Sequence, residues 1–470
     1  MASTPLFTHE FHPSILRAYD IRGIVGKTLF DKDAYAIGFG FAKIVQSSRQ
    51  IETPRIIIGY DGRLTSPALS KALAEGLTDG GAEVIDIGLG PTPMLYFADI
   101  HLKGDGAIQI TGSHNPKDYN GFKMVISHRS FYGDDIQQLG QALRQGFAAN
   151  AKGSYVRQDI FDLYIQQLHE NCEIDDFNLV WDTGNGAAGP AVLALTDKLG
   201  GVHKTLFTDV DGTFPNHHPD PVDPHTLSFL REACANAGAV CGLGFDGDGD
   251  RLGIIDAKGR QVPGDILTAY LATEFLSRHK GQTILFDVKS SKAAMDIVSK
   301  AGGKPELWKT GHSHMKSRMA EIGCALAGEM SGHIFIKDNY HGFDDALYVA
   351  VRVLNTMTKT QKTITDFMDE LPVSHTSPEC RVDCDDDIKF DVMDALQAHV
   401  KTQYDPNALT LIDGIRVNQT DGWWLIRASN TEAALVVRAE GDDEAALAAK
   451  ISDIQSLLAS QNIRWDGPSS

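Results

Sequence analysis

The segment Arg55-Ile-Ile-Ile-Gly-Tyr-Asp61-Gly-Arg63 shows a pattern that recurs along the chain: a short apolar run rich in β-branched residues that ends in an aspartate and a polar turn. Leu179-Val-Trp-Asp182-Thr-Gly-Asn-Gly186 and Thr283-Ile-Leu-Phe-Asp287-Val-Lys-Ser-Ser291 repeat it. A stretch with helical character follows each run, over 66–78, 187–199 and 292–301. Strands that alternate with helices are typical of α/β units on largely parallel sheets, so three such units are predicted.

A second pattern occurs once in each unit, where an apolar strand enters a polar loop and another apolar strand leaves it. These are the serine loop Thr111-Gly-Ser-His-Asn-Pro116, the aspartate loop Asp246-Gly-Asp-Gly-Asp-Arg251 and the glutamate loop Gly328-Glu-Met-Ser-Gly-His333. The sequence itself does not repeat, yet three α/β domains that each contribute one polar loop is the simplest interpretation. We expect the three loops to converge.

The remainder of the chain, from about Val373, differs from these units. Strand-like Trp423-Trp-Leu-Ile-Arg427 and Ala433-Ala-Leu-Val-Val-Arg438 flank the turn Ala428-Ser-Asn-Thr431, and an amphipathic helix follows over 443–458. This succession predicts a smaller α+β domain with a polar turn of its own.

Length and charge limit the domain organisation and the partners. A chain of 470 residues is expected to form three or four domains with a cleft available between them. We place the limits of these domains at 1–152, 153–256, 257–372 and 373–470. The net charge of −19 argues against nucleic acid and against an anionic membrane as partners, since both require a basic surface. An anionic substrate must therefore be held by a local cluster of cations.

The start of the chain and its cysteines indicate a cytoplasmic protein. The first thirty residues lack the apolar run of a secretory signal, and no transmembrane segment is found. The six cysteines include no C-x-x-C pair and are too few for a disulfide framework. We expect reduced thiols, a cytoplasmic location and a monomer.

The serine loop places the hydroxyl of Ser113 in a tight turn whose backbone amides could face an anion. Ser113 is therefore a candidate nucleophile or phosphate carrier, and the alternative is an ordinary turn after a strand. A serine-hydrolase elbow is excluded, because Thr111 and Asn115 stand where G-x-S-x-G requires glycines.

The aspartate loop is more specific, because three carboxylates at alternate positions, separated by glycines, can curl onto one hard cation. An EF-hand is excluded, since Arg251 and Ala257 stand at its sixth and twelfth positions. So few carboxylates favour Mg²⁺, completed by water and a phosphate oxygen, over a caged Ca²⁺. Arg251 then lies beside the metal, where it can reach a phosphate. The alternative is a solvated acidic turn.

Two further motifs match the patterns of other protein classes. Gly242-Leu-Gly-Phe-Asp-Gly247 matches G-x-G-x-x-G, but no helix follows to hold a pyrophosphate, so a dinucleotide site is rejected. Asp209-Val-Asp211-Gly-Thr213 resembles the nucleophile motif of the haloacid-dehalogenase superfamily, although the run before it is a poor buried strand. It defines an alternative function, a sugar phosphatase that depends on Asp209.

The other polar segments suit a phosphorylated sugar. The glutamate loop joins a carboxylate, a hydroxyl and an imidazole, groups that suit sugar hydroxyls and proton transfer. Arg427-Ala-Ser-Asn-Thr431 offers a guanidinium, two hydroxyls and an amide to a phosphate. Cations that stand at strand ends or glycine-rich turns, and that would otherwise be surface charges, are Arg17, Arg22, Lys123, Lys289 and His312.

Together, these segments resemble the α-D-phosphohexomutases. Arg17-Ala-Tyr-Asp-Ile-Arg-Gly23, the serine, aspartate and glutamate loops and Arg427-Ala-Ser-Asn-Thr431 follow one another in the order found in that superfamily, over almost the whole chain. The Glu-Met-Ser-Gly-His sequence of the glutamate loop is most similar to the bacterial phosphomannomutase/phosphoglucomutases.

The resemblance implies four domains around a central cleft: a phosphoserine-loop domain, a metal-binding domain, a sugar-recognition domain and a C-terminal phosphate-binding domain. It implies an Mg²⁺-dependent isomerase of carbohydrate metabolism that interconverts hexose 6-phosphate and hexose 1-phosphate, of mannose, glucose or both. The phosphoryl group passes through phosphoserine at Ser113. A hexose 1,6-bisphosphate is the intermediate and activator, and it must turn end over end within the site.

The implied site contains three sets of residues. The metal set is Ser113, Asp246, Asp248 and Asp250. The catalytic set is Ser113, His114, Lys123, Arg22, Arg251 and His333. The substrate-binding set is Arg17, Tyr19, Lys289, His312, Glu329, Ser331, Arg427, Ser429, Asn430 and Thr431. Lys123, Arg22 and His333 remain alternatives for orienting and deprotonating the accepting hydroxyl.

Other functions share parts of this chemistry. A phosphoglucosamine mutase would use the same serine and metal on another sugar. A phosphatase would admit water in place of the accepting hydroxyl. A non-catalytic sugar-phosphate binding protein would not need Ser113 beside a metal loop.

Overall fold

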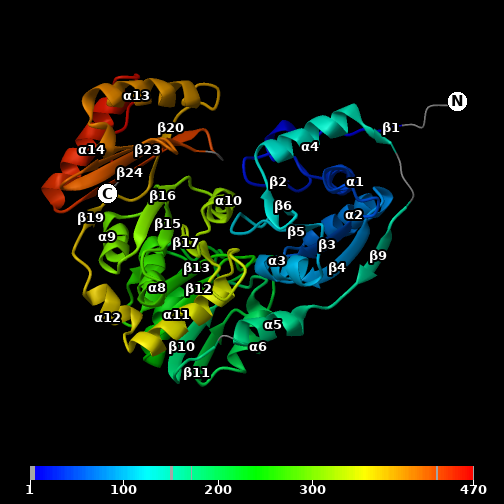
Figure 1. The fold of residues 1–470 in the computed structure, drawn as a ribbon, viewed down its shortest axis with the longest axis horizontal. Helices are drawn as coiled ribbons and strands as arrows, with labels where there is room; N and C mark the ends of the chain where they lie inside the picture. The colour runs from blue at the N-terminus through cyan, green and yellow to red at the C-terminus, as the bar shows by residue number, and fades with distance from the viewer. Residues whose placement is uncertain (1–5, 149–151, 171, 430–431, 469–470) are drawn as a thin grey trace.

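The structure, a computed structural model, describes residues 6–148, 152–170, 172–429 and 432–468. Four large β-sheets with flanking helices follow one another around the described part of the molecule, and the last (orange to red) lies beside the third (green) in Figure 1. Strand β1 (Leu6–Phe7) pairs with β8 (Phe147–Ala148) and ties the start of the first domain to its end. Within the described ranges, no helix is long and apolar enough to cross a membrane.

The first three sheets share one arrangement of four strands. In the first sheet the four strands are, in spatial order, β4 (Glu83–Leu89), β3 (Arg55–Tyr60), β5 (Gly106–Ile110) and β6 (Tyr119–Ile126). In the second sheet they are β11 (Gly201–Leu206), β10 (Phe177–Asp182), β12 (Cys241–Phe245) and β13 (Leu252–Asp256). In the third sheet they are β16 (Lys304–Trp308), β15 (Thr283–Asp287), β17 (Leu326–Gly328) and β18 (Ile334–Ile336). In each, the first two neighbouring pairs are parallel and the last pair is antiparallel. The prediction of three related α/β domains is therefore confirmed.

The polar loops occupy equivalent places in the three sheets. Each one joins the third strand of the shared arrangement to the fourth: β5 to β6, β12 to β13, and β17 to β18. The recurring aspartate stands at the end of the parallel neighbour of that third strand, which is β3, β10 or β15. Because carboxyl ends of neighbouring parallel strands meet at one edge of a sheet, each aspartate lies beside the polar loop of its own domain.

Additional strands widen the first two sheets. In the first sheet β2 (Ile21–Ile24) and β7 (Arg129–Phe131) pair with β6, and β9 (Ser154–Arg157) pairs with β4. In the second sheet β14 (Gln261–Val262) pairs with β13. The limits predicted at 152 and 256 thus cut β9 and β14 from their sheets. We propose that the first domain continues through β9 and the second through β14.

Helices flank the sheets of these three domains. The first has η1 (Pro13–Ile15), α1 (Asp31–Arg49), α2 (Ser66–Asp79), α3 (Thr92–His101) and α4 (Asp134–Gln145). The second has α5 (Phe161–Glu170), α6 (Gly189–Thr196) and α7 (Ser228–Ala237). The third has α8 (Gly264–Arg278), α9 (Lys292–Lys300), α10 (His312–Ile322), α11 (Ala346–Thr360) and α12 (Ile364–Asp369).

The predicted helix limits hold where local signals fix them. Helix α2 begins at Ser66 with a proline in its first turn, and the side chain of Ser291 caps α9 by accepting from the amide of Ala294. Helix α6 is shorter than the predicted 187–199. The amide of Ala187 donates to the carbonyl of Gly247 in the aspartate loop, so a tertiary contact replaces the first helical turn.

The C-terminal domain has the predicted α+β architecture. Its antiparallel sheet runs β19 (His375–Thr376), β24 (Ala434–Gly441), β23 (Gly422–Ala428), β22 (Ile415–Gln419) and β21 (Leu409–Thr410), with β20 (Cys380–Asp383) also paired to β24. The flanking helices are α13 (Lys389–Gln403), η2 (Pro406–Ala408) and α14 (Glu444–Ala459). Helix α14 lies where the amphipathic pattern predicts it, and the carboxylate of Asp443 caps it.

Each domain has its own sheet, but the apolar cores do not all follow the domains. One continuous core includes side chains of all three α/β domains, from Ile57 and Phe97 through Trp181 and Phe245 to Phe286 and Leu354. The C-terminal domain has a separate core around Trp424 and Leu396. A small cluster of Val288, Trp423 and Leu425 joins it to the third domain.

Candidate active site

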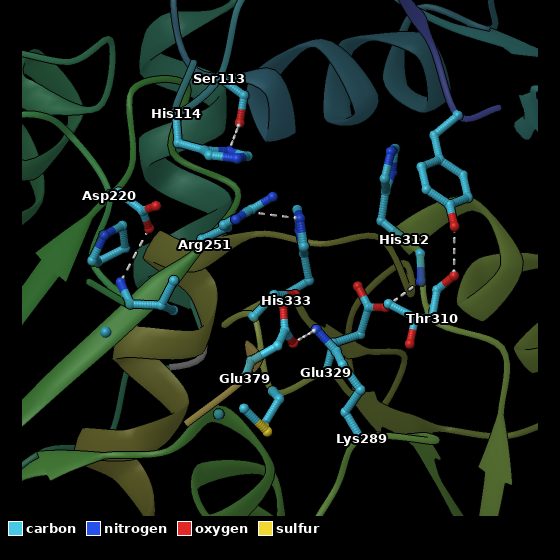
Figure 2. Close-up of a pocket in the computed structure, with 18 of the residues that line it drawn as sticks. Ser113, His114, Asp220, Arg251, Lys289, Thr310, His312, Glu329, His333 and Glu379 are labelled. Carbon is cyan, nitrogen blue, oxygen red and sulfur yellow. Dashed lines mark hydrogen bonds and ion pairs between the residues drawn. The ribbon is translucent and has the colours of Figure 1, made fainter. Parts of the chain in front are cut away.

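A cavity of about 770 Å³ lies where the four domains meet. Figure 2 shows the side chains of Ser113, Arg251, Glu329 and Glu379, one from each domain, around this space. The residues predicted for the site that line it are Arg17, Tyr19, Arg22, Ser113, His114, Lys123, Arg251, Lys289, His312, Glu329, Ser331 and His333. The polar loops therefore converge on one central cleft, as the sequence predicts.

Ser113 is held in a strained turn next to the aspartate loop. Its backbone has φ 47°, a left-handed conformation that is uncommon outside glycine. Its hydroxyl donates to Oδ2 of Asp246 at 2.9 Å and lies 3.2 Å from Nδ1 of His114. Burial and the cations Arg251 and Arg22 lower the pKa of His114 well below its usual value. The serine oxygen thus faces a carboxylate and an imidazole that stays neutral at pH 7.

The strand-terminal aspartate Asp61 fixes the serine loop. Its carboxylate accepts from the hydroxyl of Thr111 at 2.9 Å and from the amide of Gly112 at 3.1 Å. Asp287 performs the equivalent role in the third domain, accepting from Ser290 and from the amide of Met330 in the glutamate loop. Asp61 and Asp287 therefore organise the loops of their domains, whereas Asp182 contacts Gly184 and His217; the three are not among the described residues that line the cavity.

The three carboxylates of the aspartate loop form a compact, buried cluster. One oxygen from each of Asp246, Asp248 and Asp250 lies within 4.8 Å of the others. The ammonium of Lys123 lies 2.7 Å from Asp248 and also contacts Asp250. The Oδ1 atoms of Asp248 and Asp250 are buried and have no hydrogen-bond partner among the described residues. Buried, unpaired carboxylate oxygens fit a divalent cation.

The pKa values of the cluster also indicate a site for a cation. Burial and the neighbouring Asp248 and Asp250 raise the pKa of Asp246 well above its usual value. Burial opposes the charge of Lys123, but the same two aspartates raise its pKa well above the usual value. Like charges crowded in a buried site need positive charge nearby, and Lys123 supplies one such charge.

The glutamate loop brings a carboxylate and an imidazole to the opposite wall. Oε1 of Glu329 accepts from the amide of Gly311 at 2.5 Å, and burial raises the pKa of this carboxyl. Nδ1 of His333 lies 3.1 Å from Asp344, and its Nε2 accepts from Nε of Arg251 at 3.0 Å. Both nitrogens of the His333 ring are therefore fixed by neighbours.

The predicted C-terminal phosphate clamp is only partly in view. Arg427 and Ser429 are buried and are not among the described residues that line the cavity, while Asn430 and Thr431 fall outside the described ranges. Nε of Arg427 donates to Asp413 at 3.1 Å. That carboxylate also accepts from the amide of Thr310, whose carbonyl accepts from Tyr19. Asp413 thus links the arginine to the cavity wall.

Several polar cavity residues and supports were not predicted. Those that line the cavity include Asp220, Glu379, Arg381, Glu432 and Arg438. Glu379 pairs with Lys289 at 3.0 Å, as Figure 2 shows. Asp344, which orients His333, stands in Gly342-Phe-Asp-Asp345 just before α11, where a sequence pattern indicates only a helix cap. No local motif marks the others, because they lie on strands and connections that reach the cavity through the domain arrangement.

Three α/β domains and a smaller fourth one, closing around a serine held against three aspartates, define the α-D-phosphohexomutase class of enzymes. Sequence models of the phosphoglucomutase/phosphomannomutase family match the chain throughout: α/β/α domain I at 13–148, domain II at 162–259, domain III at 263–374 and the C-terminal domain at 379–454. The chain belongs to this phosphoglucomutase/phosphomannomutase family.

Individual relatives agree with that assignment. A phosphomannomutase/phosphoglucomutase of Pseudomonas putida is 43% identical over 442 residues, which is 94% of each chain. The crystal structure of a phosphoglucomutase/phosphomannomutase family protein from Burkholderia thailandensis superposes with a TM-score of 0.89 at 38% identity, covering 98% of this chain and 100% of that one. An Aspergillus fumigatus N-acetylphosphoglucosamine mutase, solved with GlcNAc-6P and magnesium, shares the fold with a TM-score of 0.55 at 16% identity, over 89% of this chain and 80% of that one.

Proposed function

We propose that the protein interconverts hexose 6-phosphate and hexose 1-phosphate, with glucose and mannose as the sugars, through phosphoserine at Ser113. The observation that carries the proposal is the hydroxyl of Ser113, 2.9 Å from Asp246 at the edge of a cavity lined by four domains. Relatives that are about 40% identical over nearly the whole chain carry the names phosphomannomutase/phosphoglucomutase and phosphoglucomutase.

Asp246, Asp248 and Asp250, with an oxygen of the group on Ser113, would hold Mg²⁺. When bound, this cation withdraws negative charge from the serine oxygen. The chain's own cations add to that effect, because Lys123 and Arg251 both line the cavity beside the aspartate loop. The aspartate loop thus presents carboxylates to the metal and Arg251 to the phosphate, and Lys123 of β6 adds a second positive charge.

The transfer itself is a balanced exchange of one bond for another. The bond between the serine oxygen and phosphorus breaks, a bond between phosphorus and the free hydroxyl of the hexose phosphate forms, and that hydroxyl loses its proton. The product is hexose 1,6-bisphosphate. After it turns end over end, its other phosphate returns to Ser113 and releases the isomeric monophosphate.

Lys123, Arg22 and His333 are the candidates for the base that removes the proton of the accepting hydroxyl. Arg22 is engaged with the serine loop, donating to the carbonyl of Gly112 at 3.1 Å. Asp344 orients the ring of His333, the arrangement of a base held by a third group. Because Nε2 of His333 accepts from Nε of Arg251, His333 can take the proton only when that hydrogen bond opens, so the three residues remain alternatives.

The dimensions of the cavity support reorientation inside the protein. A volume of about 770 Å³ is in the upper range of small-molecule sites. Tyr19, Lys289 and His312 line it away from Ser113 and would hold the distal phosphate or the sugar. Asp209, by contrast, is exposed and is not among the described cavity residues, so nothing supports the alternative phosphatase.

The test is a comparison of substrates. We expect turnover of glucose 1-phosphate and mannose 1-phosphate without release of inorganic phosphate, and a lower kcat/KM for glucosamine phosphates. Glucosamine phosphate as the best substrate would instead identify a phosphoglucosamine mutase, and release of inorganic phosphate would identify a phosphatase. We further infer a cytoplasmic location and a monomer.

Arg427→Ala is expected to weaken 1-phosphate and 6-phosphate sugars alike. Reorientation exchanges the two phosphates, so the distal clamp must accept either end, and hydrogen bonds to charged groups contribute roughly 1.5–3 kcal/mol each. The KM for both isomers should therefore rise together in steady-state assays. Arg464→Ala, at an exposed arginine of the same domain, is the control. A variant that spares one phosphate position would contradict the clamp.

Glu329→Ala is expected to reduce kcat/KM for glucose and mannose phosphates together and to leave inhibition by inorganic phosphate nearly unchanged. Glucose and mannose differ only at the 2-hydroxyl, and Glu329 is proposed to contact other hydroxyls. The control is Glu329→Gln, which keeps an acceptor for the amide of Gly311 but has no charge. Loss of activity toward only one of the two sugars would refute the assignment.

A further inference from the structure

Arg63, at the turn after β3, bonds to several groups of the serine loop. Its side chain is 1% exposed. Its guanidinium donates to four main-chain carbonyls, three in the serine loop and one at the start of β6: Nη2 to those of Ser113 (2.7 Å) and Asn115 (2.5 Å), and Nη1 to those of Pro116 (2.6 Å) and Tyr119 (3.0 Å). The carboxylate of Asp61 lies 3.3 Å from its Nε.

The shape of the loop explains why an arginine is needed there. With Ser113 in a left-handed conformation, the chain turns sharply, and the four carbonyls named above point toward one centre. Carbonyls cannot bond to one another, and a buried carbonyl without a donor is costly. A planar guanidinium offers several donors in a fixed fork and can satisfy four acceptors at once. Arg63 is therefore the centre around which the serine loop is folded.

The second domain closes over this arginine. The ring of Phe214 lies 5.4 Å from the guanidinium carbon of Arg63. The backbones meet so closely that a Cβ on Gly212 would lie 2.7 Å from Cα of Arg63, and a Cβ on Gly62 would lie 2.2 Å from Val210. The segment 210–214, which we name the cover segment, thus packs directly on the base of the serine loop.

The cover segment includes most of the motif that the sequence analysis considered as a phosphatase nucleophile. The carboxylate of Asp211 accepts from the amide of Thr213 at 2.8 Å and from its hydroxyl at 2.7 Å. The amide of Asp211 donates to the carbonyl of Asn185, which anchors the segment to the rest of its domain. These contacts give the Asp-Gly-Thr sequence a structural use in shaping the turn that carries Phe214.

We propose that Arg63 is a positioning residue that fixes the serine loop so that Ser113 Oγ lies against Asp246, and that the cover segment holds Arg63 in place. This inference deepens the proposed function and rests on it. The aspartate loop and the cover segment belong to the same domain, so one unit carries both the acidic cluster and the support of the serine. The second domain therefore sets the distance between nucleophile and acidic cluster from two sides.

The first test is Arg63→Lys in the full-length protein. A lysine has one donor nitrogen and cannot span four carbonyls. We expect kcat with glucose 1-phosphate to fall about 10²-fold, because small displacements of a reacting group have effects of that size. The KM should stay close to the wild-type value, since both Nη atoms of Arg63 donate to main-chain carbonyls and are not available to a substrate.

Two matched variants separate positioning from folding. Arg352→Lys alters another buried arginine, which pairs with Asp338 and does not line the cavity, so it should lose thermal stability but keep kcat. Phe214→Leu changes only the cover and should lower kcat about tenfold, with little further loss when combined with Arg63→Lys. Phe229→Leu, at a half-exposed phenylalanine of the same domain that contacts Phe207 and His217, should keep the wild-type kcat.

Hydrogen exchange gives a readout that does not depend on turnover. In Arg63→Lys and Phe214→Leu, the amides of 111–120 should exchange faster than in the wild type, while Arg352→Lys and Phe229→Leu leave them unchanged. Unchanged exchange and kcat in both Arg63→Lys and Phe214→Leu would overturn the proposal. So would a loss of kcat in Arg352→Lys equal to that in Arg63→Lys. A wild type without mutase turnover would refute the proposed function instead. The hydrogen-exchange data would still show whether Arg63 fixes the serine loop.

Discussion

Ser113→Ala is expected to lower mutase turnover by several orders of magnitude while hexose phosphates still bind. The hydroxyl is the proposed covalent relay of the phosphoryl group, and removing such a nucleophile removes the pathway and not only a contact. Steady-state assays with glucose 1-phosphate measure the loss, and calorimetric titration measures binding. Intact-mass spectrometry should find one phosphate on the wild type and none on the variant.

Ser127→Ala is the matched control for this prediction. Ser127 also has a left-handed backbone, with φ 51°, but stands on the exposed turn between β6 and β7. The same substitution there should change neither turnover nor phosphate content. If the phosphate mapped to Asp209, the alternative phosphatase mechanism would replace the proposed one.

Removal of divalent cations is the second change with a large expected effect, and it should stop turnover. Mg²⁺ should restore activity better than Ca²⁺, whose larger radius and looser geometry would hold the phosphoserine less strictly. Asp248→Asn should raise the Mg²⁺ concentration at half-maximal activity, because it removes one negative charge and one of the unpaired buried oxygens. A titration of turnover against Mg²⁺ measures both effects.

Asp256→Asn provides the comparison in the same domain. Asp256 is buried at the end of β13 and pairs with Arg260, and it is not among the described residues of the cavity. Its substitution is expected to cost stability and to leave the Mg²⁺ requirement unchanged. An unaltered Mg²⁺ titration in Asp248→Asn would remove the three-carboxylate site.

The sequence allowed the repeated part of the fold to be predicted because each unit has two local signals. The first is an apolar run that ends in Asp61, Asp182 or Asp287, and the second is a polar loop between two further runs. Both signals depend on residues close together in the chain. They do not predict edge strands, which carry neither signal. The edge strands β9 and β14 are short and only partly apolar, and the predicted domain limits at 152 and 256 separate each of them from the sheet that it joins.

The residues of the site also divide into those that local motifs predict and those that only the folded chain brings together. Ser113 and the three aspartates stand in short motifs with several polar residues each, and the spacing of these residues is enough to predict their chemistry. Asp344 and Glu379 reach His333 and Lys289 from other segments, and only the folded chain brings them there. Arg63 stands two residues after the strand-terminal Asp61, but its place in the sequence does not indicate that its side chain donates to the carbonyl of Ser113, fifty residues later in the chain.

The division of the apolar cores has a consequence for how the protein is made. The three α/β domains contribute to one shared core, whereas the C-terminal domain has its own and is synthesised after them. At 5–20 residues per second, the C-terminal domain takes on the order of ten seconds to be synthesised. During that interval the serine and aspartate loops can already fold against each other, but the wall that carries Glu379 and Arg438 does not yet exist. A nascent chain therefore acquires Ser113 and the aspartate loop before it acquires the wall that completes the cavity.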